Sequence, residues 1–247
     1  MNTLVVQSYK SQFPNWLRKC QDSVRTWTEK HNYDYNFIDD AIFSLNPDWF
    51  NDKLKHRLPI KSDLARLLYI KNHLLKYERV VWFDIDTFIF APDLFSLSDT
   101  PYLFGEERWI QPHKNSWRIY KNACNAFCQF QRGNAFLEFY IDTALRIISD
   151  VDPNHIAPQL IGPKLLTALH GAITLPLTPA VGSASPWLIQ TCAQNNDRLI
   201  NRIAHTLTHT PCVALNMCAS LAETEDALER CMVFLQHFYT SGITSKV

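Results

Sequence analysis

The feature that most constrains the fold is a short run of apolar residues, Val80 to Phe83, that stops at two acidic residues. Alternate side chains of a strand point to opposite sides, so an uninterrupted apolar run is typical of a strand covered on both faces. Such a strand needs a layer of structure on each side, and helices supply these layers in parallel sheets. The residues that follow are Asp84-Ile85-Asp86, so the sequence predicts two carboxylates at the end of a buried strand.

Strand and helix patterns alternate along much of the chain. Thr3 to Gln7 is a short apolar run, a helical spacing follows from Pro14, and Tyr33 to Phe37 alternates with period two. Together these segments predict a β-α-β unit and a parallel sheet. Later elements are expected as strands over 102–104 and 125–130 and as helices over 135–148 and 163–169, the last ending before Gly171. The predicted fold class is α/β, with a mostly parallel central sheet flanked by helices.

We expect a single domain over residues 1–247. The sequence shows no internal repeat, no low-complexity tract and no linker rich in glycine and serine. A proline-rich stretch over 176–186 is expected to be a loop between two parts of that domain. The alternation of strand and helix patterns is clear over residues 1–175, whereas 176–247 form a C-terminal part whose organisation is less defined.

Glycine is scarce in this chain. It contains 6 glycines, where average usage of about 7% would give roughly seventeen. No two of them have the spacing of GxGxxG or GxxxxGK[ST], which excludes Rossmann dinucleotide loops and Walker-A phosphate loops. If the protein binds a nucleotide, groups other than a glycine-rich loop must neutralise its phosphates.

Charge and cysteine content exclude further classes of protein. The 24 basic and 24 acidic residues cancel, so no long-range field attracts nucleic acid. The 7 cysteines include no CxxC pair, which argues against a zinc ribbon and favours reduced thiols in the cytoplasm. No apolar run is long enough for a membrane span or an export signal. We therefore expect a cytoplasmic protein, and we leave open peripheral membrane contact and secretion as an effector.

The first candidate site is the carboxylate pair of Asp84 and Asp86. On an extended chain two such residues share a face. Two charges about 4 Å apart near a protein surface repel by roughly 4 kcal/mol at an effective dielectric of 20. A divalent cation removes that cost, and oxygen ligands favour Mg²⁺ or Mn²⁺. Ligands of open sheets gather at the carboxyl ends of strands, which is where this pair is expected.

The second candidate is Asp63 with Arg66. Their spacing places both on one face of a helix. We expect this helix to begin near Ser62, with Ser62 as its N-cap and Asp63 in the first turn, where the helix dipole favours an anion. The helix leads into the strand that ends at Asp84, so Arg66 is expected near the carboxylate pair.

Three weaker patterns have simpler explanations. A second D-x-D at Asp150 and Asp152 follows a helical stretch and precedes a proline, as loop or capping residues do. Cys124 and Cys128 flank a predicted strand and are expected to be core thiols. Basic and aromatic residues alternate over 108–121, which we interpret as an exposed loop, with a lid facing an acceptor as the alternative.

Several segments together resemble glycosyltransferase family 32, the sugar transferases with a D-x-D motif. The family includes bacterial polysaccharide and lipopolysaccharide transferases, fungal mannosyltransferases and relatives among clostridial glucosylating toxins. The resemblance covers most of residues 4–170 and rests on four segments: VVQSYKS near the N-terminus, IKSDLARLLYI followed by VVWFDIDTFIF, NAFCQFQRGNAFLE and IGPKLLTAL. The central pattern is S-D-x-x-R, an apolar helix and a hydrophobic strand running into D-x-D.

The resemblance implies a fold and an activity. The fold is the GT-A type of nucleotide-sugar transferases, with the donor-binding core over 1–175. The activity is transfer of a hexose from a nucleoside diphosphate sugar, such as UDP- or GDP-hexose, to a glycan, glycolipid or protein acceptor. Retention of configuration, dependence on Mn²⁺ or Mg²⁺ and a role in polysaccharide biosynthesis follow from the same resemblance.

The resemblance also implies roles for individual residues. Asp86 binds the cation directly, and Asp84 contacts it through water or touches the ribose and donor sugar. Asp63 and Arg66 hold the sugar hydroxyls and a diphosphate oxygen, which makes Arg66 catalytic together with the two aspartates. The other donor-binding residues are expected along the nucleobase and in the donor pocket, and one late histidine is expected at the metal: Val6, Gln7, Tyr9, Asn125, Gly162 and His237.

Two other functions fit part of the pattern. Aspartyl-phosphate phosphohydrolases also place D-x-D after a buried strand, but they have a small hydroxyl or β-branched residue where this chain has Phe88. A non-catalytic module that binds nucleotide sugars or glycans on the same fold is the second alternative. Loss of the carboxylates would favour such a module, and here Asp63, Arg66, Asp84 and Asp86 are all present.

Overall fold

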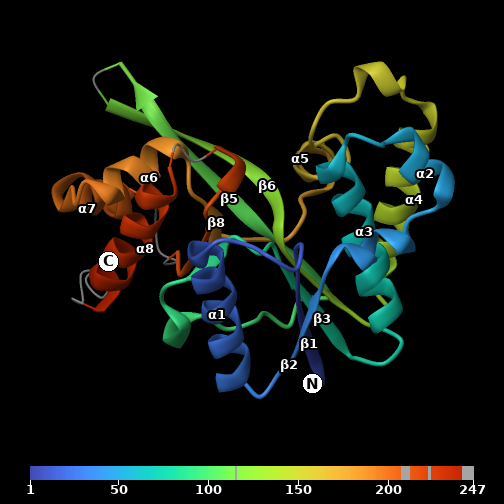
Figure 1. The fold of residues 1–247 in the computed structure, drawn as a ribbon, viewed down its shortest axis with the longest axis horizontal. Coiled ribbons are helices and arrows are strands. Elements are labelled where there is room, and N and C mark those ends of the chain that lie inside the picture. Colours follow the sequence, from blue (N-terminus) through green and yellow to red (C-terminus); the bar gives the residue numbers. More distant parts are fainter. Residues whose placement is uncertain (115, 207–211, 222–223, 241–247) are drawn as a thin grey trace.

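The first forty residues form the predicted β-α-β unit in the computed structural model of the chain, which describes residues 1–114, 116–206, 212–221 and 224–240. Strand β1 (Thr3–Ser8) is followed by helix α1 (Asn15–Lys30) and strand β2 (Asp34–Ile38). β1 and β2 pair in parallel, with Leu4 opposite Asp34. α1 covers one face of these strands (Figure 1).

A six-stranded sheet forms the centre of the molecule (Figure 1), in the order β2-β1-β3-β6-β5-β7. The added strands are β3 (Arg79–Phe83), β5 (Tyr102–His113), β6 (Ser116–Gln131) and β7 (Leu177–Thr178). β1 pairs in parallel with β2 and β3, and β5 pairs in parallel with β7. β6 is antiparallel to both of its neighbours. The predicted α/β class with a mostly parallel central sheet is thus confirmed.

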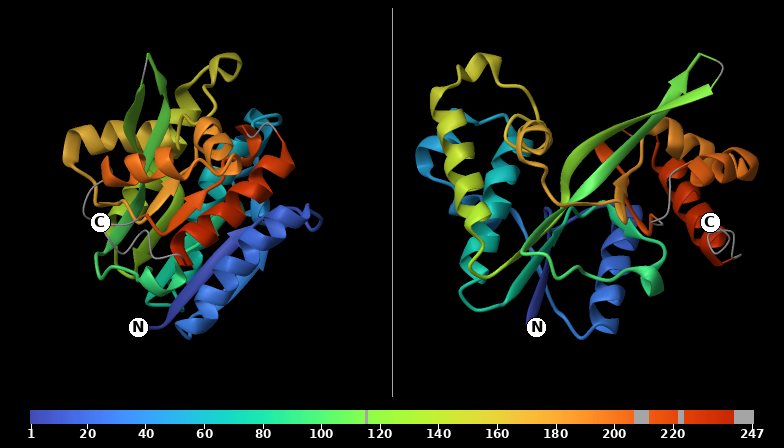
Figure 2. Two further views of the ribbon diagram at one scale, coloured as in Figure 1. Left: turned by 90° about the vertical axis from the view of Figure 1, so that its left-hand side faces the viewer. Right: turned by 180° about the vertical axis from the view of Figure 1, so that it is seen from behind.

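Helices cover both faces of this sheet (Figures 1 and 2). One side carries α2 (Asp48–Lys53), α3 (Leu58–His73), α4 (Ala135–Asp150) and α5 (Pro163–Ile173). The other side carries α1 together with α6 (Pro186–Ala193), α7 (Asp197–Thr206) and α8 (Glu225–Thr240). Short 3₁₀ turns lie at Asp40–Leu45, Pro92–Leu94, Pro153–His155 and Ala219–Leu221. No helix among the described residues has the length and apolar character needed to span a membrane.

β3 is buried on both faces, as its apolar run predicts. Val80 and Trp82 belong to the hydrophobic cluster beneath α3 and α4. Val81 and Phe83 belong to the opposite cluster, with α1 and the C-terminal helices. The aspartates therefore follow a strand that has a hydrophobic cluster on each of its two faces.

The C-terminal part builds a second, three-stranded sheet. Its order is β4-β9-β8, with β4 (Thr87–Ile89) antiparallel to β9 (Ala214–Asn216) and β9 parallel to β8 (Val181–Ser183). β4 directly follows the two aspartates, so this sheet extends from the end of β3. Residues of β8, β9, α6 and α8 share one hydrophobic cluster with α1.

Helix α3 begins earlier than predicted. It starts at Leu58, with Pro59 in the first turn, and its N-cap is Arg57. Ser62 is therefore a helical residue and not the cap, and Asp63 lies in the second turn. Proline suits the start of a helix because its missing N–H has no partner there. The Asp63 carboxylate is consequently stabilised by side-chain contacts and not by the helix dipole.

The segment 108–121 is not a loop. It forms the distal half of a long β5–β6 hairpin, in which Trp109 pairs with Tyr120 and Gln111 with Arg118. Figures 1 and 2 show the hairpin (green) projecting beyond the helical layers. Its charged and aromatic side chains alternate with period two, which is a strand pattern that their polarity conceals.

Two smaller boundaries also differ. α5 continues through Gly171 and ends at Ile173, where Thr174 adopts a left-handed conformation with φ of 54°. The stretch 176–186 is not only loop, because it contains β7 and β8. Its prolines lie beside these short strands and not within them, which agrees with the inability of proline to donate to a strand ladder.

Replacing Phe83 by alanine is expected to destabilise the fold by about 3–5 kcal/mol, since the ring is fully buried and its loss leaves a cavity. The ring contacts the aromatic rings of Trp27, Phe95 and Phe127. Urea denaturation measures the change. The matched control is Phe139→Ala, at an exposed position of α4, which should cost less than about 1 kcal/mol. Equal costs for the two variants would contradict this account of the core.

Candidate functional site: a carboxylate pair backed by a buried arginine

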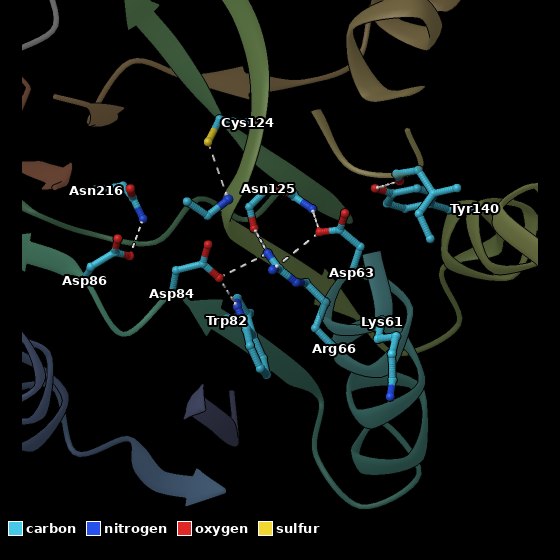
Figure 3. A network of polar contacts seen from close by, with 12 residues as sticks. Lys61, Asp63, Arg66, Trp82, Asp84, Asp86, Cys124, Asn125, Tyr140 and Asn216 are labelled. Atoms are coloured by element: carbon cyan, nitrogen blue, oxygen red, sulfur yellow. Dashed lines mark hydrogen bonds and ion pairs between the residues drawn. The ribbon is translucent and has the colours of Figure 1, made fainter. Parts of the chain in front are cut away.

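Asp84 and Asp86 lie in a tight turn between β3 and β4. The amide of Asp84 donates to the Ala126 carbonyl at 2.7 Å, and the amide of Thr87 donates to the Asp84 carbonyl at 2.9 Å. The pair is therefore not on an extended chain, which was the geometry expected from the sequence. The turn nevertheless presents both carboxylates on the same side (Figure 3).

Asp84 is fixed by contacts from three directions. Its Oδ1 accepts a hydrogen bond from Trp82 Nε1 at 2.8 Å and forms an ion pair with Arg66 Nη1 at 3.1 Å. Its backbone carbonyl accepts from Gln7 Nε2 at 3.3 Å. The Asp84 side chain is still 30% exposed. One oxygen thus binds the protein while the carboxylate remains open to solvent.

Asp86 is held by the second sheet. Asn216 Nδ2, at the end of β9, donates to Asp86 Oδ1 at 2.6 Å, and Met217 N donates to the Asp86 carbonyl at 2.8 Å. Asn216 Oδ1 accepts from Cys218 N at 2.9 Å, and this contact orients the amide with its NH₂ group toward Asp86. The two aspartates are therefore anchored to different sheets.

Arg66 lies behind the pair and is almost completely buried, with a side-chain exposure of 7%. Its Nη1 donates to the Asn125 carbonyl at 2.5 Å, and its Nη2 lies 3.5 Å from Asp63 Oδ1. The guanidinium also lies over the Trp82 ring, 5.3 Å from its centroid. Burial lowers the pKa of Arg66, but Asp84 and Asp63 outweigh it and raise the pKa overall. Arg66 therefore stays charged and neutralises two carboxylates at once.

Asp63 completes this buried network (Figure 3). Its Oδ1 accepts a hydrogen bond from Asn125 Nδ2 at 2.8 Å. Burial raises the pKa of Asp63 to about 6, although Arg66 and the Asn125 amide act in the opposite direction. The spacing of Asp63 and Arg66 along α3 puts both on the face that points toward Asp84.

Gly162 packs directly against Asp63 and Asn125. It is the N-cap residue of α5 and directly precedes Pro163. A Cβ at this position would lie 2.5 Å from Asp63 Oδ2 and 3.0 Å from Asn125 Nδ2. The close approach of Asp63 and Asn125 therefore leaves no room for a side chain at this position. The segment is anchored by Tyr140, whose hydroxyl donates to the Ile161 carbonyl at 2.8 Å.

The structure thus brings together most of the residues singled out in the sequence: Asp63, Arg66, Asp84, Asp86, Asn125 and Gly162. Their surroundings differ from those expected in one respect. Arg66 and Asp63 are buried and paired with one another and with Asn125. Only the aspartate pair is open to solvent.

Four other candidates lie differently. Val6 and Gln7 are fully buried. The Gln7 amide donates to the Asp84 carbonyl and accepts a hydrogen bond from the Tyr35 hydroxyl at 3.0 Å. Their side chains therefore offer no surface to a nucleobase. Tyr9 is partly exposed and packs edge-on against a neighbouring phenylalanine ring. His237 is exposed in the last turn of α8.

No cluster of three or more His, Cys, Asp or Glu side chains suited to a metal is present in the described part of the chain. Asp84, Asp86 and His237 therefore do not form a three-residue ligand set here. Asn216 and Trp82, which hold the two aspartates, were missed at the level of sequence. Trp82 lies in the predicted strand two positions before Asp84. This spacing is the one sequence signal for a contact between the two side chains. For Asn216 no local pattern indicates a role.

The thiols near the site are not nucleophiles. Burial raises the pKa of both Cys124 and Cys128 to about 12, so both remain protonated at neutral pH. The expectation that they are core thiols is confirmed by their burial. The second D-x-D also has the predicted role, since Asp150 ends α4 and Asp152 caps the next turn by accepting from Asn154 N.

Among the solved structures similar to this chain are two glycosyltransferases of low sequence identity to it. No protein-family model matches the sequence, and no curated protein matches it either. One similar structure is a glycosyltransferase involved in the glycosylation of the major capsid of PBCV-1, with 13% identity and a TM-score of 0.46, covering 95% of this chain and 98% of that one. Another is the apo-form glycosyltransferase GlyE of Streptococcus pneumoniae TIGR4, with 10% identity and a TM-score of 0.43, covering 98% of this chain and 64% of that one. The resemblance to glycosyltransferase family 32 stays a prediction.

Replacing Gly162 by alanine should destabilise the protein by about 1–3 kcal/mol, because the new methyl group overlaps the buried Asp63 carboxylate. Gly171→Ala is the matched control, since a Cβ there meets nothing within 4 Å and the residue lies inside α5. That control should be neutral or stabilising by up to about 1 kcal/mol. Denaturant titration distinguishes the two, and equal effects would mean that the close approach at Gly162 carries no cost.

The raised pKa of Asp63 has a consequence for stability. Unfolded aspartate titrates near 3.8, whereas the pKa of folded Asp63 is about 6. Between these values the folded state holds a proton that the unfolded state has lost, so this group's contribution to stability falls as the pH rises. The free energy of unfolding of the wild type minus that of Asp63→Asn should therefore decrease from about pH 4 to pH 6.

Denaturation of both proteins across this range tests the sign. Asp142→Asn, at an exposed position of α4, provides the background for removing a carboxylate. A difference between wild type and Asp63→Asn that rises with pH would show that Asp63 is ionised throughout the window.

Proposed function

We propose that the protein is a metal-dependent glycosyltransferase that moves a hexose from a nucleoside diphosphate sugar to a glycan, glycolipid or protein acceptor, with retention of configuration. The observation that carries the proposal is the solvent-open pair of Asp84 and Asp86 at the carboxyl end of β3, with Arg66 paired to Asp84 from behind. The S-D-x-x-R and D-x-D spacing of the sequence leads to the same assignment.

The carboxylate pair fits Mn²⁺ or Mg²⁺ in its donor chemistry. Both side chains offer hard oxygen ligands, and the remaining coordination positions are left to water and substrate phosphates, as is usual for Mg²⁺ in nucleotide sites. Each carboxylate has a supporting hydrogen bond, from Trp82 to Asp84 and from Asn216 to Asp86. Such outer contacts orient ligands in metal sites. When bound, the cation supplies positive charge that stabilises the departing nucleoside diphosphate.

The two aspartates and Arg66 have different roles in the proposed reaction. Asp86 is assigned to the cation itself, and Asp84 to a water on the cation or to the ribose and donor sugar. Arg66 is assigned a positioning role, because both Nη atoms of its guanidinium contact protein groups, namely Asp63, Asp84 and the Asn125 carbonyl. A direct contact between Arg66 and a diphosphate oxygen would require one of these pairs to open.

Burial of Arg66 has a chemical benefit for this reaction. A carboxylate pair beside a diphosphate carries an excess of negative charge, and an ion pair in surroundings of low dielectric is screened less than one in water. Arg66 thereby offsets part of the negative charge that Asp84 and Asp86 bring together. The charge is fixed before the substrate arrives, so no reorganisation is needed during the reaction.

The proposal predicts metal-dependent release of nucleotide from at least one donor. The purified protein is incubated with UDP- and GDP-hexoses, with MnCl₂ or with EDTA, and the released nucleotide is measured. Asp86→Asn should lower the rate at least 100-fold, a loss typical of removing one charge-stabilising group. Asp150→Asn, in the other D-x-D, lies at the exposed end of α4 and should keep the full rate.

The result also separates the alternatives. A phosphohydrolase would release phosphate from simple phosphoesters and leave nucleotide sugars intact. A non-catalytic module would show thermal stabilisation by a nucleotide sugar without nucleotide release. Absence of any metal-dependent response, or an unchanged rate in Asp86→Asn, would refute the transferase. With a reactive acceptor, the anomeric configuration of the product, read by NMR, tests retention.

A further inference from the structure

The distal half of the β5–β6 hairpin has two chemically different faces. Ile110 and Ile119 are opposite each other on the first face, with Pro112 opposite Trp117 further out. Ile110 is buried in the core cluster that includes α6 and α8, and Trp117 lies beneath Arg202 of α7, whose guanidinium is 5.0 Å from the ring centroid. The hydroxyl of Ser185 at the start of α6 donates to the Ile110 carbonyl. This first face anchors the hairpin to the body of the protein.

The second face, here called the hairpin face, is aromatic and polar. The register places three cross-strand pairs on it: Glu107 with Asn122, Trp109 with Tyr120 and Gln111 with Arg118. Tyr120 is 37% exposed, and the Arg118 guanidinium lies 5.1 Å from the centroid of its ring. At the inner end Asn122 Nδ2 donates to Glu107 Oε2 at 2.8 Å.

The two aromatic rings of the hairpin face are not explained by their own packing. Trp109 and Tyr120 are direct cross-strand partners, a position where aromatic side chains commonly stack on each other. Within the described residues, however, no ring contact joins Trp109 to Tyr120 or to another aromatic side chain. The apolar contacts that secure the hairpin come from the opposite face. The Trp109 side chain is also partly exposed, so its indole is available for a ligand.

The hairpin face is continuous with the aspartate pair. Side chains two apart on a strand share a face, so Tyr120 and Asn122 are followed inward by Cys124. Cys124 Sγ lies 3.4 Å from the amide of Ala126, whose carbonyl accepts from Asp84 N. After burial, the charges that raise the pKa of Cys124 are those of Glu107 and Asp84. Cys124 thus lies between the hairpin face and the aspartate pair.

We infer that the hairpin face binds the acceptor, and that the acceptor is a chain of several sugars. This inference rests on the proposed transferase function. The flat face of an indole or phenol ring carries partial negative charge and attracts the C–H-rich face of a sugar, while the amide of Gln111 and the guanidinium of Arg118 can bond its hydroxyls. A polar face with two aromatic rings suits a glycan better than a protein surface, which would need a larger apolar core.

The length of the hairpin face sets the length of the ligand. Trp109 is four residues from Gly105, the partner of Cys124, which corresponds to about 13 Å along an extended strand. A single sugar held at Trp109 could not also reach the aspartate pair. An oligosaccharide could occupy both, with its reacting end at Asp84 and Asp86 and a more distant sugar on Trp109.

Affinity electrophoresis tests the inference directly. The full-length protein is run in native gels cast with mannan, dextran, galactan, xylan or hyaluronan, and binding to hexasaccharides and single sugars is compared by tryptophan fluorescence. At least one polymer should retard the wild type, and its hexasaccharide should bind at least tenfold more tightly than its single sugar. Trp109→Ala and Tyr120→Ala should weaken binding at least fivefold, and Trp109→Phe should restore most of it.

The matched control is Trp49→Ala, which removes an exposed tryptophan from α2, outside the hairpin, and should bind as the wild type does. Thermal unfolding of each variant verifies that the hairpin is intact. If no polymer retards the wild type, or if Trp109→Ala binds equally well, the inference is wrong.

The outcome is independent of the donor assay. Metal-dependent nucleotide release without binding to any polymer would refute the hairpin face and leave the transferase standing. Polymer binding that depends on Trp109, without release from any donor, would refute the transferase and retain a glycan-binding face.

Discussion

The site depends on one buried cation. Arg66 sits inside the protein with Asp63 on one side and Asp84 on the other, and its charge is satisfied only because both carboxylates are present. Removing one partner of such a buried pair leaves an uncompensated charge, which costs far more than the pair itself contributes. The surrounding structure follows from this constraint: α3 must present Asp63 and Arg66 on one face, Asn125 must meet Asp63 with its amide, and the residue that precedes α5 must have no side chain.

The second constraint is that the two aspartates belong to different substructures. Asp84 is tied to the central sheet through Ala126 and Trp82, whereas Asp86 is tied to the small sheet through Asn216. The C-terminal part therefore contributes to the site and to the core that it shares with α1. Its role is to hold one carboxylate in place while the N-terminal strands hold the other.

Local patterns predicted what is local in the fold. The β-α-β unit, the buried strand before Asp84 and the shared face of Asp63 and Arg66 all follow from spacing within a few residues. The start of α3 was misplaced because Leu58 and Pro59 form its first turn, and the hairpin was missed because its charged side chains conceal the alternation. Asn216 could not be found, since its bond to Asp86 joins residues 130 apart in sequence. Gly162 was singled out by resemblance, but its reason, contact with Asp63, becomes visible only in three dimensions.

The separate anchoring of the two aspartates has a mechanical consequence. The turn from Asp84 to Thr87 is the covalent link between the large and small sheets at this point, and any displacement of one sheet against the other changes the separation of the two carboxylates. A cation held by Asp86, with Asp84 contacting it through water, would link the two sheets. Ligand binding would then restrict movement of the C-terminal layer. Conversely, a change that makes this layer more rigid would favour ligand binding.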